Sequence, residues 1–204
     1  FCMPSQIESE ISSLIRLIDK VYSLFGFSYS VELSTRPEDS MGTDEAWNAA
    51  ENALKNALES ENIKYSINEG DGAFYGPKID FHIKDCLQRQ WQCGTIQLDF
   101  QMPERFDLTY VDENGEKVRP VMLHRVIFGS IERFIGILIE HFAGAFPVWL
   151  APEQVKILPI TDSCHESAMK LKEKLEEAGV ERVSVDTRNE KIGYKIREAQ
   201  VEKV

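Results

Sequence analysis

The stretch Leu123–Leu138 reads LHRVIFGSIERFIGIL, an apolar helix-like run with a histidine and two arginines set into it. Apolar residues recur from 131 to 142 at intervals of three and four, which predicts an amphipathic helix with one face on a core. Gly129 and Ser130 indicate its start, with Ser130 as the N-cap and backbone N–H groups able to meet an anion.

Two polar residues of this stretch call for an explanation. Arg133 lies near the positive end of the helix, where a cation is unfavourable unless an anion or an aromatic ring is close. A buried pair with Asp99 or Glu132 is the alternative. His124 is either a hydrogen-bonded core histidine or a metal ligand, and no second ligand lies at local spacing. The residues themselves leave both alternatives open.

The segments before this stretch alternate between helical and strand patterns. Helices are expected over 7–25 and 43–60, strands over 29–35, 79–83 and 91–100, and a hairpin over 107–119. Short turns between strands predict an α+β fold, an antiparallel sheet flanked by helices, for residues 1–150.

Beyond residue 151 the pattern becomes strand, helix, strand, helix, over 155–160, 165–178, 183–186 and 192–203. This order predicts an α/β domain with a parallel sheet over 151–204. The pattern stops after about two βα units, so we expect both domains to be incomplete and the sequence to be a fragment.

Composition excludes several classes of protein. The chain has 204 residues, 43% of them hydrophobic, and a net charge of −11, which argues against binding nucleic acid through bulk charge and leaves only a local patch. No apolar run is long enough for a membrane span, and four scattered cysteines are typical of reduced thiols in a cytoplasm.

A strand with period two over 91–100 would place Ile96 and Leu98 on one face and the polar row Cys93, Thr95, Gln97 and Asp99 on the other. Small uncharged polar groups suit the floor of a ligand pocket, although an ordinary edge strand is the alternative. Gly94 indicates a close backbone approach.

The glycine-rich loop 70–78 precedes a further strand. Its glycines are too irregular for a dinucleotide or P-loop fingerprint, and a plain turn would account for them. A plain turn does not require Tyr75 and Lys78 together on the loop.

Five segments taken together resemble the class II aminoacyl-tRNA synthetases, and within them the threonine-specific family. HRVIFGSIERFIGIL is similar to motif 3 of the class, and the matches in chain order are LSTRPE (33–38), GAFYGPKIDF (72–81), WQCGTIQLDF (91–100), the motif 3 stretch (124–138) and RNEKIGYKIREAQ (188–200).

The resemblance implies that threonine and Mg²⁺-bound ATP form threonyl adenylate, and that the acyl group then passes to tRNA(Thr). Without an enzyme nucleophile, the protein contributes positioning and charge stabilisation. Arg133 would be the catalytic arginine, lying against the adenine and reaching the phosphates. The other implied binding residues are Gln92 and Thr95 for ATP, Tyr75, Cys93, Gln97 and Ser130 for threonine, and Lys78 at the border of the site.

His124 would be one of three ligands of a Zn²⁺ ion, one per subunit, that grips the amino and hydroxyl groups of threonine. Bonding the hydroxyl rejects valine, which an apolar pocket distinguishes poorly. The family's other two ligands, its motifs 1 and 2 and its editing domain correspond to no part of this sequence. The resemblance implies a cytoplasmic homodimer, with these 204 residues inactive alone.

The second region resembles the anticodon-binding domain of these enzymes, in which Asn189 and Arg197 would touch anticodon bases. Arg188, Lys191 and Lys195 would add a local basic patch, and a solvated helix face is the alternative. Two other functions remain open, a prolyl-like class II synthetase and a non-catalytic synthetase-like regulatory protein.

Overall fold

The computed structural model describes residues 1–204, which divide into two compact units, Phe1–Ile135 and Gly136–Val204. Both mix helices with strands, as predicted, and the sheet of the first unit is mostly antiparallel. None of the helices has the length and apolarity needed to cross a lipid bilayer.

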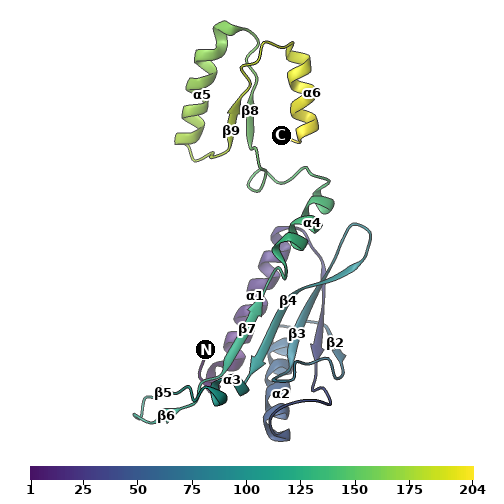
Figure 1. Cartoon of the computed structure of the whole chain (residues 1–204), viewed down its shortest axis with the longest axis vertical. Helices are drawn as coiled ribbons and strands as arrows, with labels where there is room; N and C mark the ends of the chain where they lie inside the picture. The colour runs from purple at the N-terminus through teal and green to yellow at the C-terminus, as the bar shows by residue number, and fades with distance from the viewer. The chain divides into compact units, whose positions relative to one another are not determined.

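The first unit is built on a five-stranded sheet in the order β2-β1-β3-β4-β7 (Figure 1). Its strands are β1 (Tyr29–Ser34), β2 (Tyr65–Asn68), β3 (Lys78–Lys84), β4 (Gln90–Asp99) and β7 (Met122–Val126). All neighbouring pairs are antiparallel except β1 and β2. The parallel strand β2 has no clear alternation in the sequence and was not predicted.

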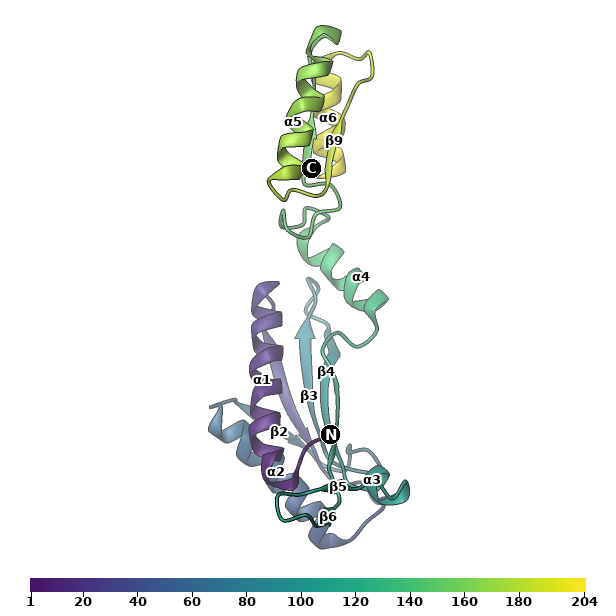
Figure 2. The same cartoon turned by 90° about the vertical axis from the view of Figure 1, so that its left-hand side faces the viewer.

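Two long helices, α1 (Ile7–Leu24) and α2 (Asp44–Ser60), cover one face of this sheet (Figure 2). Both were predicted, and Thr43 caps α2 by accepting a hydrogen bond from the Ala46 N–H. Apolar strand residues alternate toward the helices, so Phe81 and Ile96 are fully buried in this core. The opposite face of the sheet is therefore left to polar side chains.

A β-bulge between β3 and β4 interrupts the alternation predicted for 91–100. Phe81 pairs with Gly94 but His82 pairs with Gln92, so Cys93 is the extra residue. The bulge therefore brings Gln92 onto the polar face opposite His82, where unbroken alternation would have placed it on the core face, and Cys93 is buried within the bulge. At Gly94 the close approach is made by a side chain on the core face, since a Cβ there would be 2.7 Å from the Tyr22 hydroxyl oxygen.

The stretch 123–138 is not one helix. Its first residues form β7, which pairs with β4, and the helix α4 spans Ile131–Phe142. Gly129, with φ of +65°, makes the turn between them, and Ser130 caps α4 as predicted by accepting from the Arg133 N–H at 3.3 Å. An apolar run of this kind does not by itself distinguish strand from helix.

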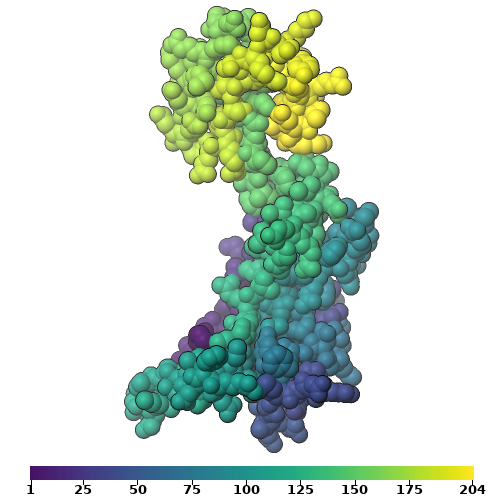
Figure 3. All heavy atoms as spheres, in the orientation of Figure 1, coloured from purple at the N-terminus to yellow at the C-terminus, as the bar shows by residue number.

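The first unit also contains several short elements. The predicted hairpin is formed by β5 (Tyr110–Val111) and β6 (Lys117–Val118), which project from the sheet (Figure 1) and form a protrusion on the surface of the unit (Figure 3). The helix α3 (Gln101–Arg105) was not predicted. Asp99 begins it by accepting hydrogen bonds from the backbone N–H groups of Gln101 and Met102.

Residues 155–202 of the second unit form two parallel strands and two α-helices in the predicted order. These are β8 (Val155–Ile157), α5 (His165–Glu177), β9 (Val183–Val185) and α6 (Ile192–Glu202). Parallel strands need a crossover, which α5 supplies between β8 and β9.

Candidate active site on the polar face of the sheet

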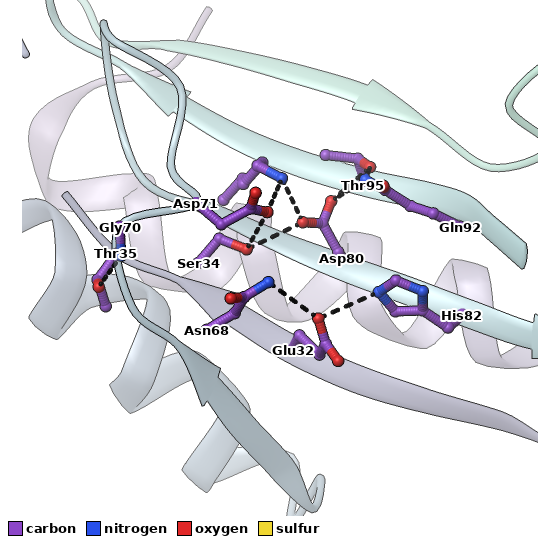
Figure 4. Close-up of polar contacts among 11 residues, drawn as sticks. Glu32, Ser34, Thr35, Asn68, Gly70, Asp71, Asp80, His82, Gln92 and Thr95 are labelled. Carbon is purple, nitrogen blue, oxygen red and sulfur yellow. Dashed lines mark hydrogen bonds and ion pairs between the residues drawn. The ribbon is translucent and has the colours of Figure 1, made fainter. Parts of the chain in front are cut away.

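Asp80 is the centre of the polar face (Figure 4). Its side chain lies on β3, and the residue is 1% exposed. Its carboxylate accepts four hydrogen bonds, from Ser34 Oγ at 3.0 Å, Lys78 Nζ at 2.6 Å, Gln92 Nε2 at 2.5 Å and Thr95 Oγ1 at 2.8 Å. These donors come from three strands, because β3 lies between β1 and β4.

Lys78 joins this centre to the glycine-rich loop. Its ammonium donates to Asp80 and, at 2.8 Å, to Asp71 on the loop. Burial acts to lower the pKa of Lys78, but hydrogen bonds to the two carboxylates raise it above its ordinary value. The hydrogen bond from Lys78 in turn lowers the pKa of Asp71. The lysine therefore carries its charge at neutral pH, with two of its three N–H groups engaged.

The loop is shaped by close backbone contacts. A Cβ at Gly76 would lie 1.7 Å from the Leu98 carbonyl oxygen, and one at Gly72 would lie 2.5 Å from the Thr35 carbonyl oxygen. Only glycine permits these approaches. They set Tyr75 against β4, where its hydroxyl donates to Gln97 Oε1 at 2.6 Å. The loop is thus part of the site and more than a plain turn.

His124 lies beside this tyrosine on β7. The ring centroids of Tyr75 and His124 are 5.6 Å apart, and His124 Nε2 is 2.9 Å from Asp99 Oδ2. Asp99 is fully buried and also begins α3, so the carboxylate that orients the imidazole is itself fixed. His124 borders two hollows, of about 280 Å³ beside Thr95 and Gln97 and of about 380 Å³ beside Tyr75.

These residues do not complete a metal site. Nowhere in the chain do three His, Cys, Asp or Glu side chains converge. His124 and Asp99 supply one imidazole and one carboxylate, whereas zinc sites in proteins use three or four protein ligands. No chemical step through a metal follows from this structure.

Arg133 reaches the same region from the first turn of α4. Its guanidinium donates to the Gln92 carbonyl oxygen at 2.7 Å and lies 5.6 Å from the centre of the Trp91 ring. The ring is the aromatic partner that its position required, and no pair forms with Asp99 or Glu132. A single N–H group of Arg133 is engaged in these hydrogen bonds, so other donors can meet an anion.

Cys93 is buried beside Arg133 in the bulge. It is 1% exposed, and burial raises the pKa of its thiol. The cysteine is therefore a neutral, protected group at neutral pH.

A smaller polar group lies beside Asp80 on the same face (Figure 4). Glu32 Oε2 is 3.4 Å from His82 Nε2 and accepts from Asn68 Nδ2 at 3.3 Å. The spacing between Glu32 and His82 allows an ion pair but is too loose for a good hydrogen bond, so the imidazole nitrogen stays buried without a close acceptor.

The structure brings most predicted residues of the first unit together. Lys78, Gln92 and Thr95 meet at Asp80, while Tyr75, Gln97 and His124 form the adjoining group, and Arg133 holds the Gln92 carbonyl. Ser130 lies at the start of α4, where its hydroxyl donates to Glu132 at 2.9 Å. Their binding roles stay predictions.

Sequence reasoning missed Asp80 and Asp71. The alternation of Lys78, Asp80 and His82 along β3 carries a signal, because it places three ionisable side chains on one face. No local pattern links Asp71 to Lys78, since the loop geometry alone brings them into contact.

A larger hollow of about 440 Å³ lies elsewhere in the first unit, beside Phe1, Met3 and Tyr110. Its lining is mainly apolar and contains no cluster of ionisable groups. The polar face of the sheet is therefore a better candidate for an active site than this apolar hollow.

In the second unit, Asn189 and Arg197 are both exposed. The predicted basic patch was wrong in part, since Lys195 is 2% exposed and donates to the Asp186 carbonyl oxygen at 2.9 Å. Arg188 pairs with the carboxylates of Asp186 and Glu198, which reduces its net positive field. The spacing of charged residues along a helix does not reveal that a lysine side chain can turn inward and donate a hydrogen bond to a buried carbonyl oxygen.

Comparison with known proteins agrees with this architecture. Residues 1–142 match the family model described as tRNA synthetase class II core domain (G, H, P, S and T), and residues 154–204 match the anticodon binding domain. The chain is 70% identical over 204 residues to a threonine–tRNA ligase of Clostridium tetani and 71% identical to one of Acetivibrio thermocellus. Each alignment covers 100% of this chain but only 32% of the relative, so the chain spans about a third of the length of these ligases.

A solved structure is also similar. The crystal structure of the RNA binding domain of threonyl-tRNA synthetase from Cryptosporidium parvum Iowa II aligns with a TM-score of 0.93 and 44% identity. The alignment covers 100% of this chain and 51% of that one. With a core-domain match over most of its length, the chain belongs to the class II aminoacyl-tRNA synthetases.

Proposed function

We propose that this chain is the part of a threonine–tRNA ligase that carries one side of the aminoacylation site and the start of the anticodon-binding domain. The observation that carries the substrate assignment is 70% identity over all 204 residues to a threonine–tRNA ligase. The polar face supports it, because its side chains are suited to binding and charge stabilisation and include no activated nucleophile.

In this proposal ATP binds over β4 and the first turn of α4. Arg133, held by the Gln92 carbonyl and Trp91, presents its planar face to the adenine and its remaining N–H groups to the phosphates. Gln92 and Thr95 bind the nucleotide, and the ammonium of Lys78 adds a positive charge at the border of the site. Mg²⁺ enters as part of the ATP complex.

Threonine is proposed to bind beside the nucleotide, near Tyr75, Gln97, Cys93 and Ser130. Attack of the threonine carboxylate on the α-phosphorus forms the adenylate and releases pyrophosphate. The hydrogen bond between Tyr75 and Gln97 holds both polar groups in fixed orientations before the substrate arrives, so less free energy is spent on ordering them.

His124 is proposed as the one zinc ligand that these residues contribute, with the remaining ligands supplied from outside the 204 residues. Asp99 supports the proposal, because a buried carboxylate on the imidazole is the usual partner of a metal-binding histidine. When bound, zinc would offer an open coordination position to the threonine amino and hydroxyl groups.

The second unit is proposed to bind the tRNA anticodon through Asn189 and Arg197. Both side chains are exposed, and the match to an anticodon binding domain supports this assignment. Dimerisation of the whole enzyme stays a prediction.

A chimera tests the proposal most directly. This chain replaces the 204 aligned residues of the Clostridium tetani ligase, and threonine-dependent ATP–pyrophosphate exchange and tRNA threonylation are measured. We expect the chimera to be active with threonine and the isolated chain to be inactive. Arg133→Ala in the chimera should reduce kcat/KM for exchange by about 100-fold, since it removes phosphate contacts that strengthen in the transition state.

The outcomes separate the alternatives. Exchange with proline in place of threonine would favour a prolyl-like enzyme, whereas a folded chimera that binds ATP without exchange would favour a non-catalytic protein. Threonine-dependent exchange by the isolated chain would contradict its expected inactivity.

Zinc binding has a separate readout. Metal analysis should find one zinc per folded chimera, less than one in His124→Ala, and no stoichiometric zinc in the isolated chain. An unchanged zinc content in His124→Ala would refute the role of His124 as a ligand.

A further inference from the structure

Asp80 is the one buried carboxylate on which three predicted binding side chains converge. Its Oδ1 accepts from Gln92 at 2.5 Å and Thr95 at 2.8 Å, and its Oδ2 accepts from Lys78 at 2.6 Å and Ser34 at 3.0 Å (Figure 4). With four donors, its acceptor sites are filled by the protein, so Asp80 itself offers no free position to a ligand.

This arrangement determines which atoms the neighbouring side chains present. A carboxylate only accepts, so the Gln92 amide must turn its NH₂ group toward Asp80 and its carbonyl oxygen away. The Thr95 hydroxyl gives its proton to Asp80 and accepts from Gln92 Nε2 at 3.1 Å. Both side chains are left with acceptor atoms for a ligand.

Lys78 complements these acceptors with a positive charge. Its ammonium is held between Asp80 and Asp71, which leaves one N–H group for a further partner. The side chain of Asp80 is 2% exposed and that of Asp71 is 54% exposed, so Asp80 is the fixed end of this pair. Burying a carboxylate is costly, and a simple surface ion pair would not require it.

We propose that Asp80 is a positioning residue for the nucleotide, acting through Gln92, Thr95 and Lys78 without touching ATP. The proposal rests on the proposed function, because it assumes that Gln92 and Thr95 bind ATP and that Lys78 adds its charge at the border of the site. Asp80 orients the amide of Gln92, uses the hydroxyl proton of Thr95 and holds the ammonium of Lys78 in place.

The test is Asp80→Asn in the chimera, with separate measurement of KM for ATP and for threonine in the exchange reaction. Asparagine keeps the shape but loses the charge and can donate, so the three side chains lose their fixed orientation. We expect KM for ATP to rise at least about tenfold, while KM for threonine changes less than about twofold. A merely structural defect would lower the active fraction, and hence kcat, and leave both KM values unchanged.

Ser34→Ala is the matched control. It removes a donor from the same buried carboxylate but leaves Gln92, Thr95 and Lys78 attached. We expect KM for ATP to stay within about twofold of the unchanged chimera. Asp80 has no positioning role if Ser34→Ala raises this KM as much as Asp80→Asn does, or if Asp80→Asn leaves it unchanged.

A second measurement applies if Asp80→Asn does not fold. A crystal structure of the unchanged chimera with ATP should show Gln92 and Thr95 in contact with both Asp80 and the nucleotide, and Lys78 in contact with Asp80. Loss of any of these contacts overturns the inference. A chimera inactive without any substitution would instead refute the proposed function, so the two failures are distinguishable.

Discussion

Gly76→Ala should disrupt the first unit through a single methyl group. The added Cβ would lie 1.7 Å from the Leu98 carbonyl oxygen, whereas real Cβ contacts essentially never fall under 3.0 Å, so the loop and β4 must separate by at least 1.3 Å. The Leu98 N–H donates to the Pro77 carbonyl at 3.1 Å, and Leu98 also pairs with Leu123 on β7. The separation therefore strains contacts on both sides of β4.

The magnitude follows from these contacts. The weakened backbone hydrogen bond costs about 1 kcal/mol, and overpacking adds about 1–3 kcal/mol. We expect the free energy of unfolding of the first unit to fall by about 2–4 kcal/mol, a large part of the stability of a typical domain.

Urea denaturation followed by tryptophan fluorescence measures this change, because Trp47 is buried in the first unit. Gly193→Ala is the control, since nothing lies within 4 Å of a Cβ at this position in α6. Gly193→Ala should raise the free energy of unfolding of the second unit by about 0.5–1 kcal/mol and leave the urea midpoint of the first unit unchanged. A loss below about 1 kcal/mol for Gly76→Ala would refute the reasoning.

Three further predictions concern stability and reactivity. Burial acts to raise the pKa of Asp85, but its hydrogen-bond donors lower it to about 2, so its stabilisation is complete above pH of about 4 and disappears as pH falls toward 2. Asp85→Asn should thus lower the urea midpoint at pH 5 and weaken its fall on acidification, and parallel curves for the two proteins would contradict this. A hydrogen bond from Thr161 lowers the pKa of the exposed Cys164 thiol, whereas burial raises the pKa of the Cys93 thiol. Iodoacetamide should therefore modify Cys164 at least about tenfold faster than Cys93, as measured by peptide mass spectrometry. Equal rates would count against the burial of Cys93. Tyr22→Phe removes a buried hydroxyl that donates a hydrogen bond to the Ile127 carbonyl oxygen at 2.6 Å. The free energy of unfolding should fall by about 1–2 kcal/mol in the same urea assay. An unchanged midpoint would show that this hydrogen bond adds no stability.

Regular elements were well predicted where one face is apolar over many residues. The helices α1 and α2 carry that pattern over several turns, and β3 alternates without interruption. Prediction failed at β2 and β7, because short runs of polar or mixed residues become strands only through their neighbours in the sheet.

The candidate site was predicted in part for a related reason. Tyr75, Lys78, Gln92, Thr95 and Arg133 could be named from the sequence, chiefly through its resemblance to a family. Their partners could not, because the relevant distances join segments far apart in the chain. Arg133, for example, contacts the carbonyl of a residue 41 positions away.

By itself, the sequence determined that the chain combines an α+β region with a short α/β region, because periodicity and turn chemistry are local properties. Only the tertiary structure decided how the polar residues are used. The bulge at Cys93 brings Gln92 onto the polar face, the close approach at Gly76 sets Tyr75 against Gln97, and Asp80 gathers donors from three strands. These features depend on strand register and backbone contact, which arise when distant segments pack together.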